Sequence, residues 1–507
     1  MGFKNRLIHY MTSFAYSRFE KNCFNPQKIQ QELWKRNLSL YRSGTYWHSF
    51  PELSKGKLEN FPLSEYEDYR DAISLSKQSG INPLTGETVL FYADSAGTTA
   101  YPKEFPITET YRKDYQSTQA LLIHKLTEAF PTFLDTPALY IVATDSAKKT
   151  NSGIEIGYIS NYNYKHMPSW LARFYAIPRE VLREESLFQE WAPAYALTQE
   201  LSAIFVITPL VLCNFFRRII DSKESLIEKL RNPRKVPTGF PPLSCASPRR
   251  DHLIHILQMK EPSIEMIWPR LSLICTWKAS LAGLQIPELR KWLPKVPIVD
   301  GMYSATEAWF NVPLADTENL GGPLCHEAGI FEFLPLDKER TPTHLLRSWE
   351  LKQGEDYEVF ITTSMGMIRY RLKDVVHCRG HLGQSPLIYF KYKAENLISL
   401  TTLRISEGQI AQALSQVGIF DLSYLRAAPS EEGTHLILAH NEKSKNYPSQ
   451  IEFEKALQNV NPYYREEREC EHVRSCQIKL LPSEHPIFAR HVQHAQSKPR
   501  LVSQTPV

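Results

Sequence analysis

One stretch of the chain combines small, hydroxyl and basic residues in a pattern suited to binding an anion. It runs from Tyr92 to Thr108 and places Lys103 four residues after the run Ser95, Ala96, Gly97, Thr98 and Thr99. Small residues around a glycine let successive backbone N–H groups point into one concavity, where hydroxyls and a lysine add donors. The GxxxxGK[ST] pattern of a Walker loop is absent. The stretch predicts a phosphate-binding loop, and the alternative is a surface turn rich in serine and threonine.

A second cluster, Met302 to Phe310, contains Tyr303, Thr306 and Glu307 directly after a strand-like segment. A carboxylate at the end of such a strand can hold a hydrated Mg²⁺ ion that bridges phosphate oxygens. The alternative is an ordinary exposed glutamate in a loop.

A third cluster is the run Arg369-Tyr370-Arg371-Leu372-Lys373-Asp374. The carboxylate of Asp374 could accept both hydroxyls of a ribose. The alternative is a solvated, charged strand end.

Buried strands and helices must position these clusters. Short apolar runs at 88–92, 138–143, 203–208, 273–277 and 296–299 are typical of buried strands, and helical patterns alternate with them at 108–129, 209–220, 223–231 and 286–293. This alternation predicts an α/β fold with helices covering a largely parallel sheet. A helix is also predicted to begin with Ser64 as its N-cap, residues 329–379 favour antiparallel strands, and a smaller unit follows residue 390.

The composition excludes several classes of protein. The 507 residues carry a net charge of only +4 and no basic tail, which gives no support for nucleic-acid binding. Eight cysteines without a CxxC pair favour reduced thiols over disulfides or a zinc site. The most apolar run, Leu201 to Cys213, is too short to span a bilayer and is broken by Pro209. We therefore expect a cytoplasmic protein.

The order of the three clusters resembles the acyl-adenylate-forming enzymes, which carry an [ST]SGTTGxPK loop, a YxxTE motif and a YRxGD motif. Within that superfamily the chain is similar to the acyl-acid amido synthetases, the auxin-responsive family, and to its bacterial members. Four further stretches carry this resemblance, together with the ending SKPRL: FNPQKIQQELWKRNLSLYRSGTYW, FPLSEYEDYR, YEVFITTSMGMIRYRLKDVV and NPYYREERE.

The resemblance implies a large adenylate-forming domain over residues 1–390, with mixed and parallel sheets, and a small mobile α+β lid over residues 391–507. It assigns Lys103 to the ATP phosphates and Glu307 to Mg²⁺, and Arg404 to the α-phosphate when the lid closes. The other residues that it implies for ATP binding are Ser95, Ala96, Gly97, Thr98, Thr99, Tyr303, Thr306, Arg371 and Asp374. Trp309 and Phe310 are candidate walls of an acyl pocket.

Several positions depart from the family pattern. Ala96 loses a hydroxyl donor, and Ala100 requires a negative φ where relatives have glycine. Lys373 replaces the glycine of YRxGD, which could strain a turn or add a positive charge beside the ribose site. Arg404 stands where relatives commonly have lysine, so it keeps the charge but changes the geometry.

The expected activity is an ATP- and Mg²⁺-dependent ligase that adenylates a small carboxylic acid and transfers the acyl group to an amine, which we expect to be an amino acid. We expect no nucleic-acid partner, no membrane span and a monomer. One alternative keeps the adenylation step but uses coenzyme A as the acceptor. Another is a pseudoenzyme that binds nucleotide and acts through a partner.

Overall fold

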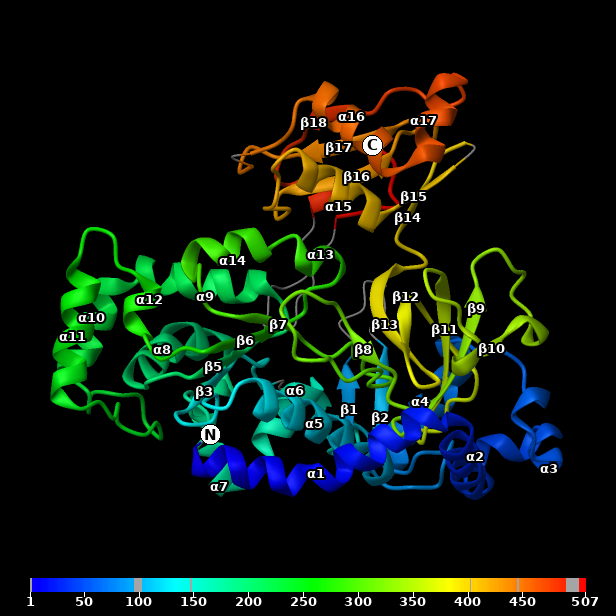
Figure 1. Cartoon of the computed structure of the whole chain (residues 1–507), viewed down its shortest axis with the longest axis horizontal. Coiled ribbons are helices and arrows are strands. Elements are labelled where there is room, and N and C mark those ends of the chain that lie inside the picture. Colours follow the sequence, from blue (N-terminus) through cyan, green and yellow to red (C-terminus); the bar gives the residue numbers. More distant parts are fainter. Residues whose placement is uncertain (1, 95–102, 146–147, 402, 445, 489–500) are drawn as a thin grey trace.

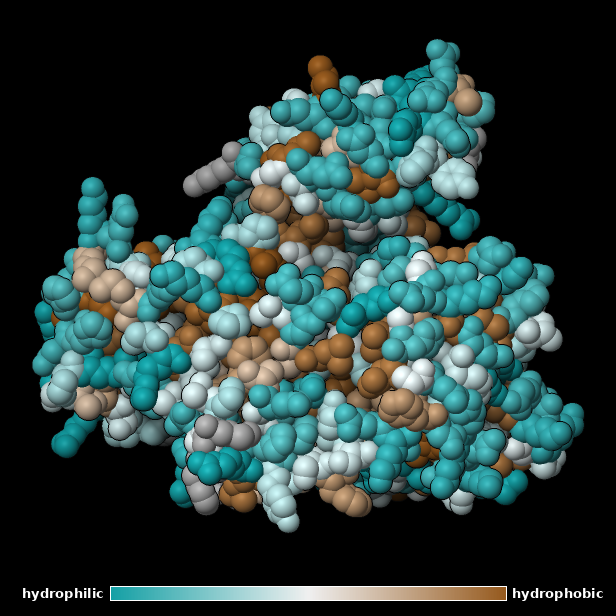
Figure 2. Space-filling view, in the orientation of Figure 1, coloured by the Kyte–Doolittle hydropathy of each residue, from teal (hydrophilic) through white to brown (hydrophobic). Residues whose placement is uncertain are grey.

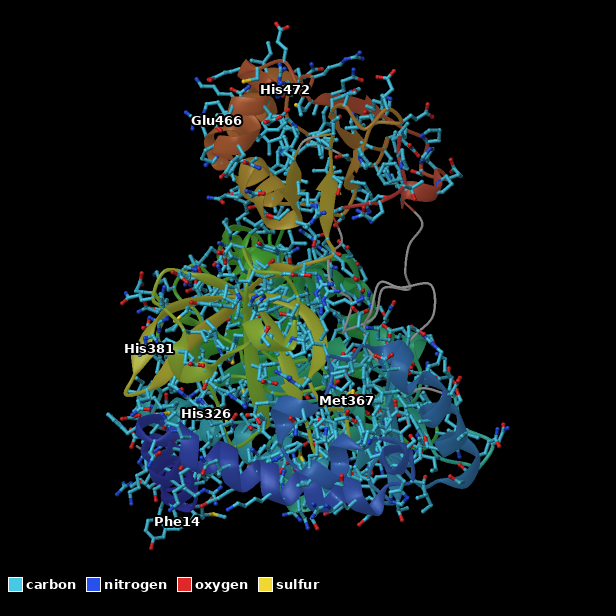
Figure 3. All side chains as sticks on the ribbon, turned by 90° about the vertical axis from the view of Figure 1, so that its right-hand side faces the viewer. Phe14, His326, Met367, His381, Glu466 and His472 are labelled. Carbon is cyan, nitrogen blue, oxygen red and sulfur yellow. The ribbon has the colours of Figure 1, made fainter. Side chains whose placement is uncertain are left out.

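The computed structural model of the chain has two parts, one stacked on the other (Figure 1). It describes residues 2–94, 103–145, 148–401, 403–444, 446–488 and 501–507. The predicted phosphate-loop residues 95–99 and the Ala100 departure lie outside these ranges. A view from the side shows the smaller, C-terminal part above the rest of the chain (Figure 3).

The first part of the chain is helical. It forms α1 (Phe3–Phe24), α2 (Pro26–Ser43), η1 (Tyr46–Ser49), α3 (Glu52–Lys55), η2 (Leu58–Asn60) and α4 (Tyr66–Ser79). The N-cap of α4 is Glu65 and not Ser64, because Asp68 completes a capping box with Glu65. The Ser64 hydroxyl instead donates to the Ile368 carbonyl at 2.7 Å.

A three-stranded sheet, in the order β2-β1-β4, carries the predicted phosphate loop. Its strands are β1 (Val89–Asp94), β2 (Glu104–Thr108) and β4 (Ile156–Gly157). We expected the loop to connect a strand to the helix after Thr108, but β2 comes between them and pairs antiparallel with β1. The helix α5 (Glu109–Ala129) then begins with Thr108 as its N-cap and packs against α1.

The larger part contains a parallel sheet, as the alternating pattern predicted, but only four of the five predicted strands belong to it, because the strand at 88–92 lies in the β2-β1-β4 sheet. The four strands of the parallel sheet follow one another in chain order: β3 (Ala138–Tyr140), β5 (Ala203–Phe205), β6 (Leu273–Thr276) and β7 (Ile298–Asp300). The elements between and beside them are α6 (Ile159–Lys165), α7 (Ser169–Ala172), η3 (Arg179–Arg183), α8 (Glu185–Thr198), α9 (Pro209–Asp221), α10 (Lys223–Arg231), α11 (Ser247–Gln258), α12 (Ile264–Ile267), α13 (Ser280–Gly283) and α14 (Ile286–Trp292). Apolar side chains of the four strands and of most of these helices form a large buried cluster.

A six-stranded antiparallel sheet follows, in the order β10-β9-β11-β12-β13-β8. Its strands are β8 (Gly322–Pro323), β9 (Ile330–Pro335), β10 (Leu346–Arg347), β11 (Asp356–Thr362), β12 (Tyr370–Leu382) and β13 (Ser385–Lys393), with η4 (Pro342–His344) and η5 (Ser348–Glu350) between them. The prediction of antiparallel strands over 329–379 is therefore confirmed.

The C-terminal part has its own apolar core. It comprises β14 (Leu397–Ser399), β15 (Arg404–Ser406), α15 (Glu407–Gln416), β16 (Leu425–Pro429), β17 (Leu436–His440), α16 (Gln450–Val460), α17 (Pro462–Glu469), β18 (Gln477–Leu480) and η6 (Pro486–Phe488). Leu281 of α13, from the larger part, belongs to this core. Brown, apolar side chains are visible at the junction on an otherwise mostly hydrophilic surface (Figure 2).

No helix among the described residues combines the length and the apolarity needed to cross a membrane.

Candidate active site

A tight hairpin after β7 presents the predicted magnesium ligand. The Phe310 N–H donates to the Tyr303 carbonyl at 2.9 Å, and Ser304 and Trp309 form a bridge. The residues 305–308 form the turn at its tip. This turn directs Glu307 inward, where its side chain is buried.

The strand β12 carries the predicted ribose ligand. The carboxylate of Asp374 accepts a hydrogen bond of 2.6 Å from the Tyr303 hydroxyl. On the neighbouring strand, Lys393 stands opposite Asp374 in the register and forms an ion pair with it. The second and third motifs are thus joined directly.

Lys103 reaches the same place from the start of β2. Its ammonium donates to the Tyr370 hydroxyl at 3.3 Å, and that hydroxyl lies 3.5 Å from a carboxylate oxygen of Glu307. The end of the phosphate-loop motif therefore meets the other two motifs through Tyr370.

Burial disfavours the charged forms of Glu307 and Lys103. Desolvation raises the pKa of Glu307, although Lys393 and Lys103 oppose this shift. Desolvation also lowers the pKa of Lys103, against the attraction of Glu307. Within the described ranges neither group has an ion-pair partner within 4.0 Å, so both would gain from a ligand that supplies a cation and an anion.

The two candidate acyl-pocket residues have different environments. Phe310 is fully buried, stacks on Tyr303 at 4.1 Å and lies 5.5 Å from the ring of Phe331. Phe310 is therefore a core residue that supports Tyr303, and its role as a pocket wall stays a prediction. Trp309 is only partly buried and stacks on Tyr115 of α5 at 5.5 Å.

Three other predicted ATP-binding residues are not joined to this group by their side chains. Thr306 contributes its carbonyl, which accepts from the Tyr111 hydroxyl at 2.8 Å. The Arg371 guanidinium is held by Glu358 at 2.6 Å and Glu65 at 2.9 Å. Arg404 is exposed at the start of β15, and no bond between described residues links it to Lys103, Glu307 or Asp374.

Lys373 shows both effects expected of its departure from glycine. Its φ is +64°, in the left-handed region that glycine favours. Its ammonium pairs with Glu65 at 2.8 Å and with Glu395 at 2.6 Å. Burial opposes the charge, but Glu395 and Glu65 raise the pKa of Lys373 overall.

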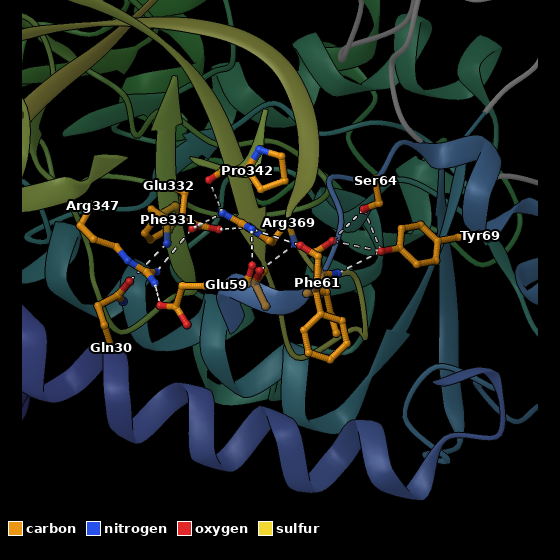
Figure 4. Close-up of polar contacts among 12 residues, drawn as sticks. Gln30, Glu59, Phe61, Ser64, Tyr69, Phe331, Glu332, Pro342, Arg347 and Arg369 are labelled. Atoms are coloured by element: carbon orange, nitrogen blue, oxygen red, sulfur yellow. Dashed lines mark hydrogen bonds and ion pairs between the residues drawn. The ribbon is translucent and has the colours of Figure 1, made fainter. Parts of the chain in front are cut away.

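Sequence reasoning missed two residues that hold β12 in place. No local sequence pattern points to Lys393, because it is the register between β12 and β13 that places it opposite Asp374. Arg369 precedes the strand and is almost fully buried, with a two-pronged ion pair to Glu332. Its remaining donors reach the carbonyls of Glu59, Phe61 and Pro342 (Figure 4). The buried guanidinium is thus fully partnered and its role is structural.

Comparison with solved structures shows which fold the chain has. The structure titled AtGH3.15 acyl acid amido synthetase in complex with 2,4-DB superposes with a TM-score of 0.82, at 16% identity, over 97% of this chain and 94% of that one. A 2-hydroxyisobutyryl-CoA ligase in the postadenylation state gives a TM-score of 0.53 at 13% identity, over 94% and 89% of the two chains. At these identities the likeness shows the fold, which is that of adenylate-forming enzymes.

Sequence comparison defines the family. Residues 15–298 match the GH3 family N-terminal domain, and residues 322–393 match the GH3 family central domain. The chain therefore belongs to the GH3 family, the acyl acid amido synthetases, which are ATP-dependent ligases.

Individual relatives are distant. The indole-3-acetic acid-amido synthetases GH3.17 and GH3.3 of Arabidopsis thaliana are each 21% identical, over 79% and 82% of this chain and 74% and 73% of their own lengths. Three rice relatives, GH3.8 among them, are 26% identical but match over only 26% to 35% of their own lengths.

Proposed function

We propose that this chain uses ATP and Mg²⁺ to adenylate a small carboxylic acid and then transfers the acyl group to an amino acid. The observation that supports this most is the contact chain Lys103–Tyr370–Glu307 beside the hydrogen-bonded pair Tyr303–Asp374. A cation, a buried carboxylate and a second carboxylate thus face one place, in a chain of the GH3 family.

In the first step, a carboxylate oxygen of the acid forms a bond to the α-phosphorus of ATP, and the bond to the pyrophosphate oxygen breaks. Negative charge develops on the leaving group, so the site must supply cations and N–H donors. Lys103 and the loop residues Ser95, Ala96, Gly97, Thr98 and Thr99 would hold the phosphates. Asp374 would bind the ribose hydroxyls, with Tyr303, Thr306 and Arg371 around the nucleotide.

Glu307 fits the donor chemistry of Mg²⁺. Magnesium is usually held by one or two carboxylates together with substrate phosphates and water, and a cage of several protein ligands is not required. Among the described residues, the Glu307 carboxylate receives only the long contact from Tyr370 and its own backbone N–H, so it has room for a cation. When bound, Mg²⁺ would neutralise charge on the phosphates.

In the second step, the amine nitrogen attacks the acyl carbon, AMP leaves, and the amine releases a proton. We propose that residues 391–507 act as a lid on residues 1–390 and bring Arg404 to the α-phosphate. Closure would exclude water from the reactive mixed anhydride. The exposed position of Arg404 supports this, because a residue that acts only after closure is not yet engaged.

The acid would lie against Trp309, which is partly buried and stacked on Tyr115. The relatives named above act on indole-3-acetic acid, and one neighbour was solved with 2,4-DB. We therefore place acids with an aromatic ring first among the candidate substrates.

We also propose that the chain is a cytoplasmic monomer related to bacterial members of the family. Its sequence is only 20% to 26% identical to those of plant relatives, which supports a distant relationship to the plant members.

Product analysis tests this proposal. The purified chain is incubated with Mg²⁺, ATP, an amino-acid mixture and a panel of aryl, indole and fatty acids. We expect an acyl–amino acid product, AMP and pyrophosphate, identified by mass. A thioester formed only with coenzyme A would favour the acyl-CoA ligase, and ATP binding without any turnover would favour the pseudoenzyme.

A further inference from the structure

The segment between η2 and α4 is attached to two strands of the candidate active site. Ser64 is bonded on both sides to β12: its N–H donates to the Arg369 carbonyl at 3.1 Å, and its carbonyl accepts from the Arg371 N–H at 2.8 Å. Its hydroxyl and that of Tyr69 both reach the Ile368 carbonyl (Figure 4). Ser64 therefore fixes the start of the strand that carries Tyr370 and Asp374.

Two residues later, Tyr66 is bonded to β2 in the same two-sided way. Its hydroxyl donates to the Glu104 carbonyl at 3.0 Å and accepts from the Glu104 N–H at 2.9 Å. Burial raises the pKa of Tyr66, so the hydroxyl keeps its proton and both bonds persist at neutral pH. Glu104 directly follows Lys103, so this pair of bonds fixes the backbone from which the Lys103 side chain leaves.

The ring of Tyr66 also faces the lysine. The Lys103 ammonium lies 5.6 Å from the centre of the Tyr66 ring and 5.9 Å from the centre of the Tyr370 ring. Phe105 packs edge-on against Tyr66 at 5.3 Å and limits its rotation. An aromatic face within about 6 Å stabilises a desolvated ammonium in its charged form.

We infer that Tyr66 is a positioning residue for Lys103: its hydroxyl fixes the backbone beside the lysine, and its ring holds the ammonium charged and directed toward the phosphate site. This inference rests on the proposed role of Lys103 in binding ATP phosphates. It is not implied by the three motifs, because Tyr66 lies outside all of them.

Two variants separate the two contributions. Tyr66→Phe removes the hydrogen bonds and keeps the ring, whereas Tyr66→Leu removes both. Tyr46→Phe is the matched control, because its hydroxyl also donates to a backbone carbonyl near the start of α4, that of Asp68 at 2.9 Å, without a contact to Lys103.

The primary measurement is the affinity of the full-length chain for Mg·ATP by titration calorimetry, with circular dichroism and thermal unfolding to show that each variant is folded. We expect the affinity to fall about fivefold in Tyr66→Phe and about thirtyfold in Tyr66→Leu, and to stay unchanged in Tyr46→Phe. The alkaline limb of ATP binding should move to lower pH in Tyr66→Leu, because the ammonium loses its aromatic partner.

A purely structural role would lower the unfolding temperature of both Tyr66 variants but leave affinity and pH profile like those of Tyr46→Phe, and this result would overturn the inference. The affinity measurement requires no turnover. If ATP binds but no product forms, the ligase proposal fails and a Tyr66-dependent affinity still supports this inference. A wild-type chain that does not bind ATP would contradict both.

Discussion

Two glutamates, one in each part of the molecule, have opposite environments. Glu454 in α16 accepts hydrogen bonds from the Tyr464 hydroxyl, the Arg468 guanidinium and the Cys476 N–H, at 2.8–2.9 Å. Burial opposes its charge, but hydrogen bonds from Cys476, Arg468 and Gln458 lower its pKa to about 2. Glu307 is buried and, within the part of the chain that the structure describes, has one side-chain contact of 3.5 Å and its own N–H; burial raises its pKa.

Under the proposed function, the difference is that between a carboxylate that stabilises the fold and one that binds a ligand. A buried charge without partners destabilises the folded state, so it persists where the missing partner arrives with the substrate. Lys103 follows the same logic, since within the described residues it has a hydroxyl and two aromatic rings but no carboxylate in ion-pair distance. We therefore expect changes near Glu307 to affect catalysis and changes near Glu454 to affect stability.

The largest effect is expected from Lys103→Met. The change keeps most of the apolar stem and removes the cation, so the rate of acid-dependent pyrophosphate exchange into ATP should fall by about 100-fold or more. Lys113→Met is the control, because that lysine is exposed on α5 and its one ion pair with another described residue is that to Glu109 at 3.6 Å. Equal losses in both variants would argue that Lys103 has no special role.

Arg404→Ala should lower the exchange rate by about tenfold without changing the unfolding temperature. The side chain is exposed and bears no bond to the large part within the described ranges, so its removal disturbs no packing. Stopped-flow measurement of adenylate formation and thermal unfolding would check the two halves of this expectation. A destabilised variant would mean that Arg404 is structural.

The sequence allowed some of the residues discussed here to be predicted, but not others. Lys103, Glu307 and Asp374 could be named as candidates because their motifs are local and ordered. The alternating apolar runs were sufficient to predict four strands of the parallel sheet. Lys393 and Tyr66 could not be identified, because strand register and a packed ring bring them to the site. The strand β2 was missed because Glu104 to Thr108 is short and contains Pro106, which is unfavourable in most strands.

Glu454→Gln should destabilise the chain by about 1–3 kcal/mol at neutral pH, because the neutral amide cannot accept from all the donors. The lowered pKa means that the wild-type contribution is full above the ordinary value of 4.5 and is lost as the pH falls toward 2. The stability difference between wild type and variant, measured by urea unfolding, should therefore shrink below pH 4.5. A difference that is constant with pH would contradict the assignment.

Glu307→Gln should change the folding stability in the opposite direction from Glu454→Gln. A carboxylate whose folded pKa is raised destabilises the fold as the pH rises above its ordinary value, so the amide variant should be more stable than wild type at pH 7, by about 1 kcal/mol. The gain should disappear as the pH falls below about 4.5, where Glu307 is protonated in both states. Thermal unfolding without ligand, from pH 4 to 8, would measure it.

The smallest effect is expected from Lys373→Gly. Glycine relieves the left-handed backbone, which costs about 1–2 kcal/mol for other residues, but it removes the pairs with Glu65 and Glu395, each worth about 0–1 kcal/mol. Stability should change by less than about 1 kcal/mol and exchange activity by less than about threefold. Lys373→Ala, which keeps the strain and loses the pairs, should be the less stable of the two variants.

The most direct test of the account is pyrophosphate exchange into ATP by wild type, Glu307→Gln and Glu454→Gln, measured against Mg²⁺ concentration with an acid that the wild type accepts. We expect exchange by the wild type, loss of about 100-fold or more in Glu307→Gln, and nearly full activity per folded molecule in Glu454→Gln. Absence of exchange by folded wild-type protein across aryl, indole and fatty acids, or equal activity of the two variants, would contradict the assignment of Glu307 to an adenylation centre.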